Sequence, residues 1–305
     1  MIPRLLAFFA LACSAFAAPD TRDKGAEHLA ALTAEPWLAG WKNAKLEDVR
    51  LVSQKENLTW PTGLAPAWWA RIVNADGSRG HISWDSRGEG ALLEFAIDTA
   101  LEIRGDNARA VGGVPSIQQF AIPADGGPVA SGCVPTSGAS VVAFWTANGF
   151  EKWRGDAAGD VHRELTKRLR ARLRMQTIAD RDGFTDGAMS LAGAMPGELA
   201  RAIQADADHF GVPVKCEFQR FAFDKLASEI SAGRPVLLSC TIAVPQKPEL
   251  SWGHAVAGVA WARVNGKQFV GIVDNFFPTK NPATIRWVRE SVFDTLTTLR
   301  PQPAK

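Results

Sequence analysis

The sequence predicts an α+β fold, in which helices and antiparallel strands occupy separate stretches of the chain. Apolar residues recur at steps of four over residues 160–178, which is typical of an amphipathic helix. Asn265 and Gly266 join two apolar runs, a pattern that predicts a tight β-hairpin. A second hairpin pattern, around Asp76 and Gly77, indicates a β-rich region ahead of the helices.

The bulk composition is that of a globular protein with room for one large domain or two small ones. The chain has 305 residues, of which 46% are hydrophobic and 22% are charged, and its formal net charge is +2. A nucleic-acid-binding protein usually shows a stronger basic excess, so we expect no nucleic-acid partner. No metal or other cofactor is expected either, because the five histidines show no ligand spacing with the cysteines.

The first 17 residues have the pattern of a secretory signal peptide. Arg4 supplies a positive charge, residues 5–16 form an apolar run, and residues 15–17 (Ala-Phe-Ala) form a small-x-small cleavage site. The run is too short to span a bilayer, and the residues before Cys13 fit a lipid-attachment site poorly. We therefore expect cleavage after Ala17 and a secreted or periplasmic protein without a membrane anchor.

Residues 18–112 are expected to form a β-rich N-terminal region. Its predicted strands are residues 67–73, 79–84 and 91–97. The first two strands are joined through the turn at Asp76 and Gly77. Glycines and a proline within residues 105–115 indicate a loop, and we place the boundary with a second domain, residues 113–305, in that loop.

The second domain is expected to contain helices followed mainly by strands. Its predicted helices are residues 137–145, 160–178, 198–210 and 223–232. Its predicted strands are residues 212–218, 235–244, 254–263 and 267–273. One face of the helix at 160–178 is rich in arginine and lysine, and we interpret it as a solvated face rather than an anion-binding patch.

Cys133 is the strongest candidate for a reactive residue. It follows Gly132 and lies just ahead of the predicted helix at 137–145. The positive end of a helix dipole lowers the pKa of a nearby thiol and favours the nucleophilic thiolate. A cysteine that only fills the core, which is the alternative interpretation, would not need this position.

The number of cysteines is informative if the protein is exported. Removal of the signal peptide leaves Cys133, Cys216 and Cys240, so at least one thiol stays unpaired in an oxidising compartment. A bridge between Cys216 and Cys240 would close a loop of about 25 residues and contribute roughly 3 kcal/mol, leaving Cys133 free. The alternative is three buried, reduced cysteines.

The hairpin at 265–266 brings a histidine close to an acid and an amide. His254 begins one strand, and Asp274 and Asn275 end the strand that folds back beside it. Cysteine, histidine and an acid or amide can act as nucleophile, general base and orienting partner of the base. A strict two-residue turn places Asn275 on the face of His254, whereas a bulge or a longer loop places Asp274 there.

Acyl-transfer chemistry also needs hydrogen-bond donors for the tetrahedral oxyanion. The backbone N–H of Cys133 is one candidate. Gln118 and Gln119 lie 15 and 14 residues before the cysteine, and either side chain could supply a second donor. Taken alone, each glutamine is more typical of a surface residue.

These residues together resemble the papain-like cysteine peptidases. Residues 132–139 (Gly-Cys-Val-Pro-Thr-Ser-Gly-Ala) and the apolar helix after them are similar to the nucleophile helix of that superfamily. The chain looks closest to the secreted bacterial relatives of bacteriocin-leader-processing peptidases, and its Gly-Cys-Val start is streptopain-like. Residues 253–256 and 272–276 are similar to the strands that carry the histidine and the aspartate. The resemblance spans roughly residues 115–280.

The resemblance implies a helical subdomain that carries the nucleophile and an antiparallel β subdomain that carries the histidine and the aspartate. It makes Cys133 the nucleophile, His254 the base and Asp274 its orienting partner. It also makes Gln119 the oxyanion glutamine, provided that residues 124–131 form an inserted loop. The implied function is a secreted cysteine peptidase that acts on peptide or protein substrates without a cofactor.

The resemblance leaves two questions open. Residues 18–112 resemble the β-rich propeptides of such peptidases, which would make them an intramolecular inhibitor or chaperone, and a permanent N-terminal domain is the alternative. The same catalytic residues would also serve an acyl-transfer enzyme or amidase of this fold. A catalytically inactive papain-like binding module would keep the fold without turnover.

Overall fold

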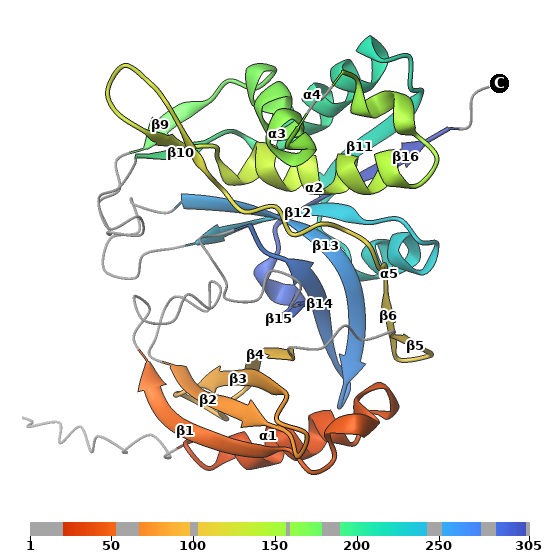
Figure 1. The fold of residues 1–305 in the computed structure, drawn as a ribbon. Coiled ribbons are helices and arrows are strands. Elements are labelled where there is room, and N and C mark those ends of the chain that lie inside the picture. The colour runs from red at the N-terminus through yellow and green to blue at the C-terminus, as the bar shows by residue number, and fades with distance from the viewer. Residues whose placement is uncertain are drawn as a thin grey trace, which may run out of the picture.

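The computed structural model describes residues 21–52, 67–97, 103–156, 159–178, 190–242, 252–275 and 285–302. They form a mixed α+β structure built on a large antiparallel sheet of twelve strands (Figure 1). The predicted α+β class is therefore confirmed at this level. The predicted signal peptide, residues 1–17, lies outside the described residues. None of the helices in the described ranges has the length and apolar character needed to cross a membrane.

Ten strands form the main path of the sheet. In spatial order they are β1 (Lys45–Val52), β2 (Ala67–Val73), β3 (Arg79–Asp85), β4 (Leu92–Ile97), β15 (Arg286–Arg289), β14 (Lys267–Val273), β13 (Trp252–Val264), β12 (Val236–Ile242), β16 (Thr295–Pro301) and β11 (Val214–Arg220). The hairpin of β5 (Arg104–Gly105) and β6 (Ala108–Ala110) joins this path through β6 and β13. Two short hairpins lie outside the sheet: β7 (Ala121–Ile122) with β8 (Val129–Ala130), and β9 (Gln176–Ile178) with β10 (Leu191–Gly193).

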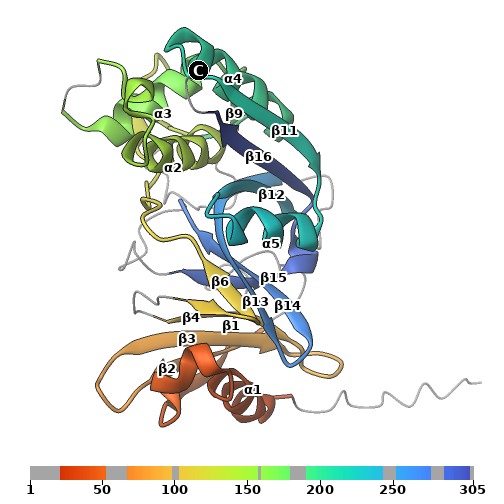
Figure 2. The same ribbon diagram turned by 90° about the vertical axis from the view of Figure 1, so that its right-hand side faces the viewer.

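Helices lie at both ends of the sheet, and a further helix packs on its strands between them. The α-helices of the described residues are α1 (Lys24–Thr33), α2 (Cys133–Ala147), α3 (Val161–Ala171), α4 (Pro196–His209) and α5 (Phe223–Ser231), and the 3-10 helices are η1 (Pro36–Trp41), η2 (Glu151–Arg154) and η4 (Glu290–Val292). Helices α2, α3 and α4 pack together at one end, α1 covers β1 and β3 at the other, and α5 packs on β13 and β6 between them (Figures 1 and 2).

The turn residues identified in the sequence form the expected hairpins. Val264 pairs with Lys267 across Asn265 and Gly266, which have φ angles of 47° and 70°. Positive φ at both central residues is what a two-residue hairpin loop requires. The pairing of β2 with β3 confirms the N-terminal hairpin as well.

Two predicted helix boundaries are wrong. Helix α2 begins at Cys133 rather than at residue 137, because Pro135 falls in the first helical turn, where its missing N–H costs nothing. Helix α3 ends at Ala171 rather than at residue 178, because the β-branched Thr177 and Ile178 belong to β9 and pair with β10. The predicted helices at 198–210 and 223–232 correspond to α4 and α5.

The basic face of α3 is used largely inside the protein. Arg168 and Arg172 contact the buried carboxylate of Asp206 in α4 at 2.8 and 3.0 Å. Arg170 donates to the backbone carbonyl of Ser131 at 2.9 Å and so ties α3 to the segment that precedes Cys133. The predicted solvated face is therefore wrong for these three arginines, which are engaged in contacts within the protein.

The sheet continues across the expected boundary at residue 112. Strand β4 pairs with β15, and β6 pairs with β13, so strands from both sides of that boundary lie next to each other. The loop predicted at 105–115 is wrong in its first part, because residues 108–110 form β6, which folds back on β5 through a turn at Asp106 and Asn107. One hydrophobic core also extends over both regions of the chain.

The disulfide hypothesis for Cys216 and Cys240 is wrong, and the cysteines of the described residues are free. Strand β16 lies between the two strands that carry these cysteines. Cys216 is opposite Leu299, whereas Ser239, next to Cys240, is opposite Thr295. Four residues along a strand span about 13 Å, whereas the Cα atoms of a disulfide lie within ~7 Å of each other.

Candidate active site

Helix α2 places Cys133 at a buried helix N-terminus. Every residue of α2 from Cys133 to Phe144 is buried. Neighbouring helices can approach α2 closely because Gly138 has no side chain. A Cβ atom added at Gly138 would lie 2.9 Å from Leu199 in α4 and 3.0 Å from Leu169 in α3. Cys133 therefore lies at the positive end of a helix that is fixed by packing on several sides.

Replacing Gly132 by alanine should destabilise the protein by about 1–3 kcal/mol and slow the alkylation of Cys133. The φ angle of Gly132 is 93°, and an added Cβ would lie 2.7 Å from the Met175 side chain and 3.0 Å from the Ala192 carbonyl oxygen. Gly113→Ala is the matched control, because Gly113 has φ 80° but nothing within 4 Å of its added Cβ. Thermal unfolding measures both variants, and equal losses would show that close packing at Gly132 is unimportant.

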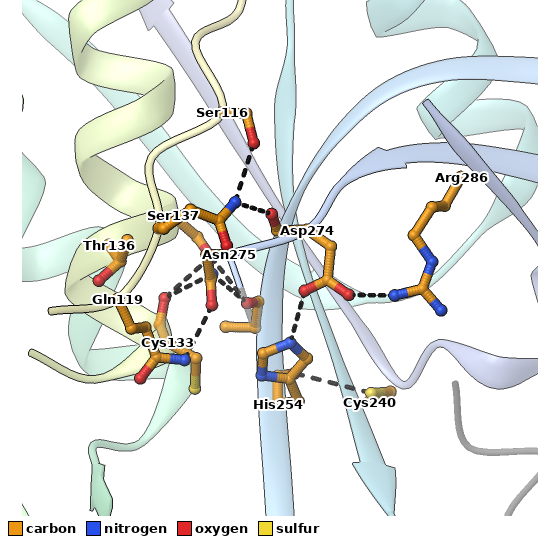
Figure 3. Close-up of polar contacts among 12 residues, drawn as sticks. Ser116, Gln119, Cys133, Thr136, Ser137, Cys240, His254, Asp274, Asn275 and Arg286 are labelled. Carbon is orange, nitrogen blue, oxygen red and sulfur yellow. Dashed lines mark hydrogen bonds and ion pairs between the residues drawn. The ribbon is translucent and has the colours of Figure 1, made fainter. Parts of the chain in front are cut away.

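His254 links Cys133 to Asp274. Its Nε2 lies 3.1 Å from Asp274 Oδ1, and both side chains are 2% exposed. Its other ring nitrogen, Nδ1, faces the sulfur of Cys133 (Figure 3). The three residues come from the start of α2, from β13 and from the end of β14.

A β-bulge determines which residue contacts His254. The pairing of β13 with β14 shifts by one residue between Gly258 and Ala260. A shift of one residue reverses the face to which each later side chain points. Asp274 therefore faces His254 and Asn275 lies on the opposite face, so the expectation from a strict two-residue register is corrected.

Asn275 joins the sheet to the start of α2. Its Nδ2 donates to the backbone carbonyls of Ala255 at 2.8 Å and Cys133 at 3.2 Å. Its Oδ1 accepts a hydrogen bond from Gln119 Nε2 at 3.0 Å. Asn275 thus holds the cysteine and the histidine strand at a fixed separation, and it does not contact the imidazole ring through these bonds.

The β7–β8 hairpin brings Gln119 back to Cys133. The predicted inserted loop, residues 124–131, forms the tip and return strand of this hairpin. Next to it, Ser131 N–H donates to Phe120 O at 2.8 Å, and Phe120 N–H donates to Ser131 Oγ at 3.2 Å. Gln119 consequently lies beside Cys133 in space despite the long spacing in the sequence (Figure 3).

Gln118, the other candidate, contacts a different part of the site. Its Nε2 donates to Ser116 Oγ and to the backbone carbonyl of Asp274, both at 3.1 Å. Its Oε1 is buried and accepts no hydrogen bond from the residues that the structure describes. Of the two glutamines, Gln119 is therefore the one placed next to the sulfur.

The environment of the site favours a thiolate and an imidazolium. Burial alone would raise the pKa of the Cys133 thiol, but the hydrogen bond and charge of His254, together with the N–H groups of Ala255 and Val134, lower it. Burial alone would lower the pKa of His254, but its hydrogen bonds to Asp274 and Cys133 raise it to about 9. Each member of the pair thus stabilises the charged form of the other.

The other two described cysteines have the opposite character. Burial, with a smaller contribution from Asp208, raises the pKa of Cys216 to about 12. Burial, with the nearby Cys133 and Asp294, raises the pKa of Cys240 well above its usual value. Of these three thiols, only that of Cys133 has a lowered pKa.

Arg286 and Glu94 extend the site, and the sequence analysis missed both. Arg286 Nη1 donates to Asp274 Oδ2, while its Nε and Nη2 donate to the two carboxylate oxygens of Glu94 at 2.9 and 3.0 Å (Figure 3 shows Arg286 and Asp274). Glu94 is 0% exposed and also contacts His81 Nε2 at 2.8 Å. The available signal was one charged residue within each of two apolar runs, residues 92–97 and 285–288.

No protein-family model matches the chain, and no curated protein sequence matches it. Within the described ranges, no three histidine, cysteine, aspartate or glutamate side chains are grouped so that they could hold a metal ion. The arrangement of Cys133, His254 and Asp274 is therefore the basis for assigning a function.

Proposed function

We propose that the protein is a secreted cysteine peptidase of papain-like fold, which hydrolyses peptide bonds through a thioester on Cys133. One observation carries this proposal: the Cys133 thiol lies at a helix N-terminus and faces Nδ1 of His254, whose other ring nitrogen lies 3.1 Å from Asp274 Oδ1 (Figure 3). A nucleophile, a base within hydrogen-bond reach and a partner that orients the base are the components of this chemistry.

In the first half of the reaction, the Cys133 thiolate attacks the carbonyl carbon of the scissile bond. We assign the backbone N–H of Cys133 and the side-chain amide of Gln119 as donors to the resulting oxyanion. The His254 imidazolium then gives a proton to the amine nitrogen as the C–N bond breaks, and the acyl group remains on the sulfur as a thioester.

In the second half, a water molecule attacks the thioester carbonyl and His254 accepts a proton from it. The C–S bond breaks, the acid product leaves, and the thiolate and imidazolium are restored. Asp274 accepts the Nε2–H of His254 throughout, which keeps Nδ1 directed at the sulfur. The protein's own side chains and backbone, together with water, supply every group in this mechanism, and a peptide or protein is the substrate.

The direct test is selective labelling followed by substrate cleavage. Iodoacetamide at neutral pH should modify Cys133 much faster than Cys216 or Cys240, because only the pKa of Cys133 is lowered. Mass spectrometry locates the label, and casein incubated with the unlabelled protein should be cleaved with addition of water. Slow labelling of Cys133 would indicate an inactive binding module, and acyl products joined to an added amine would indicate a transferase.

Peptide hydrolysis should decline as the pH rises through about 9. The pKa of His254 is raised to about 9, and the imidazolium must be present to protonate the leaving amine. Because the pKa of Cys133 is lowered, its alkylation rate should already be high at neutral pH and change little up to that point. The measurement is kcat/KM and alkylation rate against pH; an alkylation rate that begins to rise only in the basic range would contradict the ion pair.

A further inference from the structure

We propose that the N-terminal region is a permanent part of the active site, in which Glu94 is a positioning residue that holds Asp274 through Arg286. This inference rests on the proposed peptidase function. It decides between the two roles that the sequence left open for residues 18–112, a removable propeptide and a permanent domain.

The guanidinium group of Arg286 connects Glu94 to Asp274 in a fixed geometry. Arg286 presents a planar fork, and its Nε and Nη2 bind both oxygens of Glu94 in a bidentate pair. That pair fixes the plane and direction of the group, so that Nη1 is directed at Asp274 Oδ2. The other oxygen, Oδ1, accepts from His254, and the position of Glu94 is thereby transmitted to the imidazole.

Both members of the Arg286–Glu94 ion pair are buried. The side chain of Arg286 is 9% exposed and that of Glu94 is 0% exposed. Burial alone would raise the pKa of Glu94, but Arg286 and His81 outweigh it and lower the pKa, so the carboxylate is ionised. Loss of one partner from a buried ion-pair network leaves the remaining charges less well compensated, so the carboxylate of Glu94 stabilises the buried guanidinium that contacts Asp274.

Strand β15, which carries Arg286, pairs directly with β4 of the N-terminal region. Arg286 pairs with Ala96 in the β4–β15 ladder, and Trp287 pairs with Phe95. The rings of Phe95 and Trp287 stack at 5.7 Å with an interplanar angle of 8°, and Trp37 lies 5.0 Å from Trp287. Removing the N-terminal region would uncover a large aromatic ring and an unpaired strand edge.

The charge of Glu94 has a consequence for the pH profile. Without it, Arg286 would still pair with Asp274, but the surroundings of Asp274 and His254 would be more positive by one unit of charge. An added net positive charge lowers the pKa of neighbouring groups, because it disfavours their protonated forms. The pKa of His254, and with it the decline of activity at basic pH, should move to lower pH by roughly half a unit to one unit.

The experiment uses the full-length chain with Glu94→Gln, which keeps the shape of the side chain and removes its charge. We expect the basic limb of the kcat/KM profile to move to lower pH by roughly half a unit to one unit. We also expect kcat to fall by about tenfold to a hundredfold, with little change in KM. Asp48→Asn is the matched control: it removes the same charge in the same region, from an exposed ion pair with Arg71. Its pH profile should equal that of the wild type.

Glu94→Asp provides the conservative variant. It keeps the charge but shortens the side chain, so the basic limb should return to the wild-type position while kcat stays reduced. Thermal unfolding shows whether each variant is folded. If Glu94→Gln does not fold, the test is the mass of the active wild-type chain after labelling at Cys133. The labelled chain should include the N-terminal region. An active labelled chain that begins after residue 112 would overturn the proposal.

The outcomes separate the inference from the function on which it rests. A folded Glu94→Gln variant with an unchanged basic limb would overturn the role of Glu94, while fast labelling of wild-type Cys133 would leave the peptidase proposal intact. Slow labelling of Cys133 in the wild type would instead contradict the peptidase proposal itself.

Discussion

Replacing Cys133 by alanine should abolish peptide hydrolysis, with a loss in kcat of about 10⁴-fold or more. Among the described residues, Cys133 has the thiol that faces His254 and whose pKa is lowered, so without it His254 has no nucleophile to activate (Figure 3). The measurement is turnover of a fluorogenic peptide together with labelling by iodoacetamide. The variant should remain folded, because the change removes a single sulfur atom at the start of a helix whose packing is otherwise unchanged.

Cys216→Ala is the matched control for this variant. Cys216 lies in β11, outside the site, and its thiol has a raised pKa. Turnover and labelling in this control should equal those of the wild type. Residual hydrolysis by Cys133→Ala at a rate near that of the control would rule out Cys133 as the nucleophile.

Replacing Asp274 by asparagine should lower kcat by roughly 10²- to 10⁴-fold, with a smaller effect on KM. The neutral amide no longer stabilises the imidazolium, and it does not specify the ring orientation that a carboxylate acceptor imposes on His254. Steady-state kinetics with a peptide substrate give the two constants separately. The same variant should show a slower alkylation of Cys133, because a weaker imidazolium stabilises the thiolate less.

The comparison variant is Asn275→Ala. It removes donors from the backbone carbonyls of Cys133 and Ala255, which should cost about 1–3 kcal/mol of folding stability. Its main effect should therefore appear in thermal unfolding rather than in the chemistry at His254. A larger loss of kcat in folded Asn275→Ala than in Asp274→Asn would reverse the assignment of the orienting residue.

Local signals in the sequence identified much of the site. Positive-φ residues at 265–266 specify a hairpin by their own backbone preferences, so His254 and Asp274 could be placed together before the sheet was known. The bulge near Gly258 could not be predicted, because it depends on how β13 and β14 fit their neighbours. The choice between Asp274 and Asn275 therefore required the structure.

The features that could not be predicted depend on contacts between residues far apart in the sequence. Strand β15 has four residues and two of them are arginines, so its length and composition give only a weak signal for a buried strand. It becomes one because β4 and β14 flank it on either side. The contact of Arg286 with Glu94 joins residues 192 positions apart, and no local pattern encodes it. The strand order also separates Cys216 from Cys240, and no local pattern encodes that order.

The position of β16 has a consequence for biosynthesis. This strand, Thr295–Pro301, lies between β12 and β11, so the interior of the sheet stays incomplete until residue 301 has left the ribosome. Pairings between residues so far apart in the chain also form slowly. Strand β11, although it is made some 80 residues earlier, can therefore join the sheet only after residues 295–301 have been synthesised, because β16 is the strand that connects it to β12.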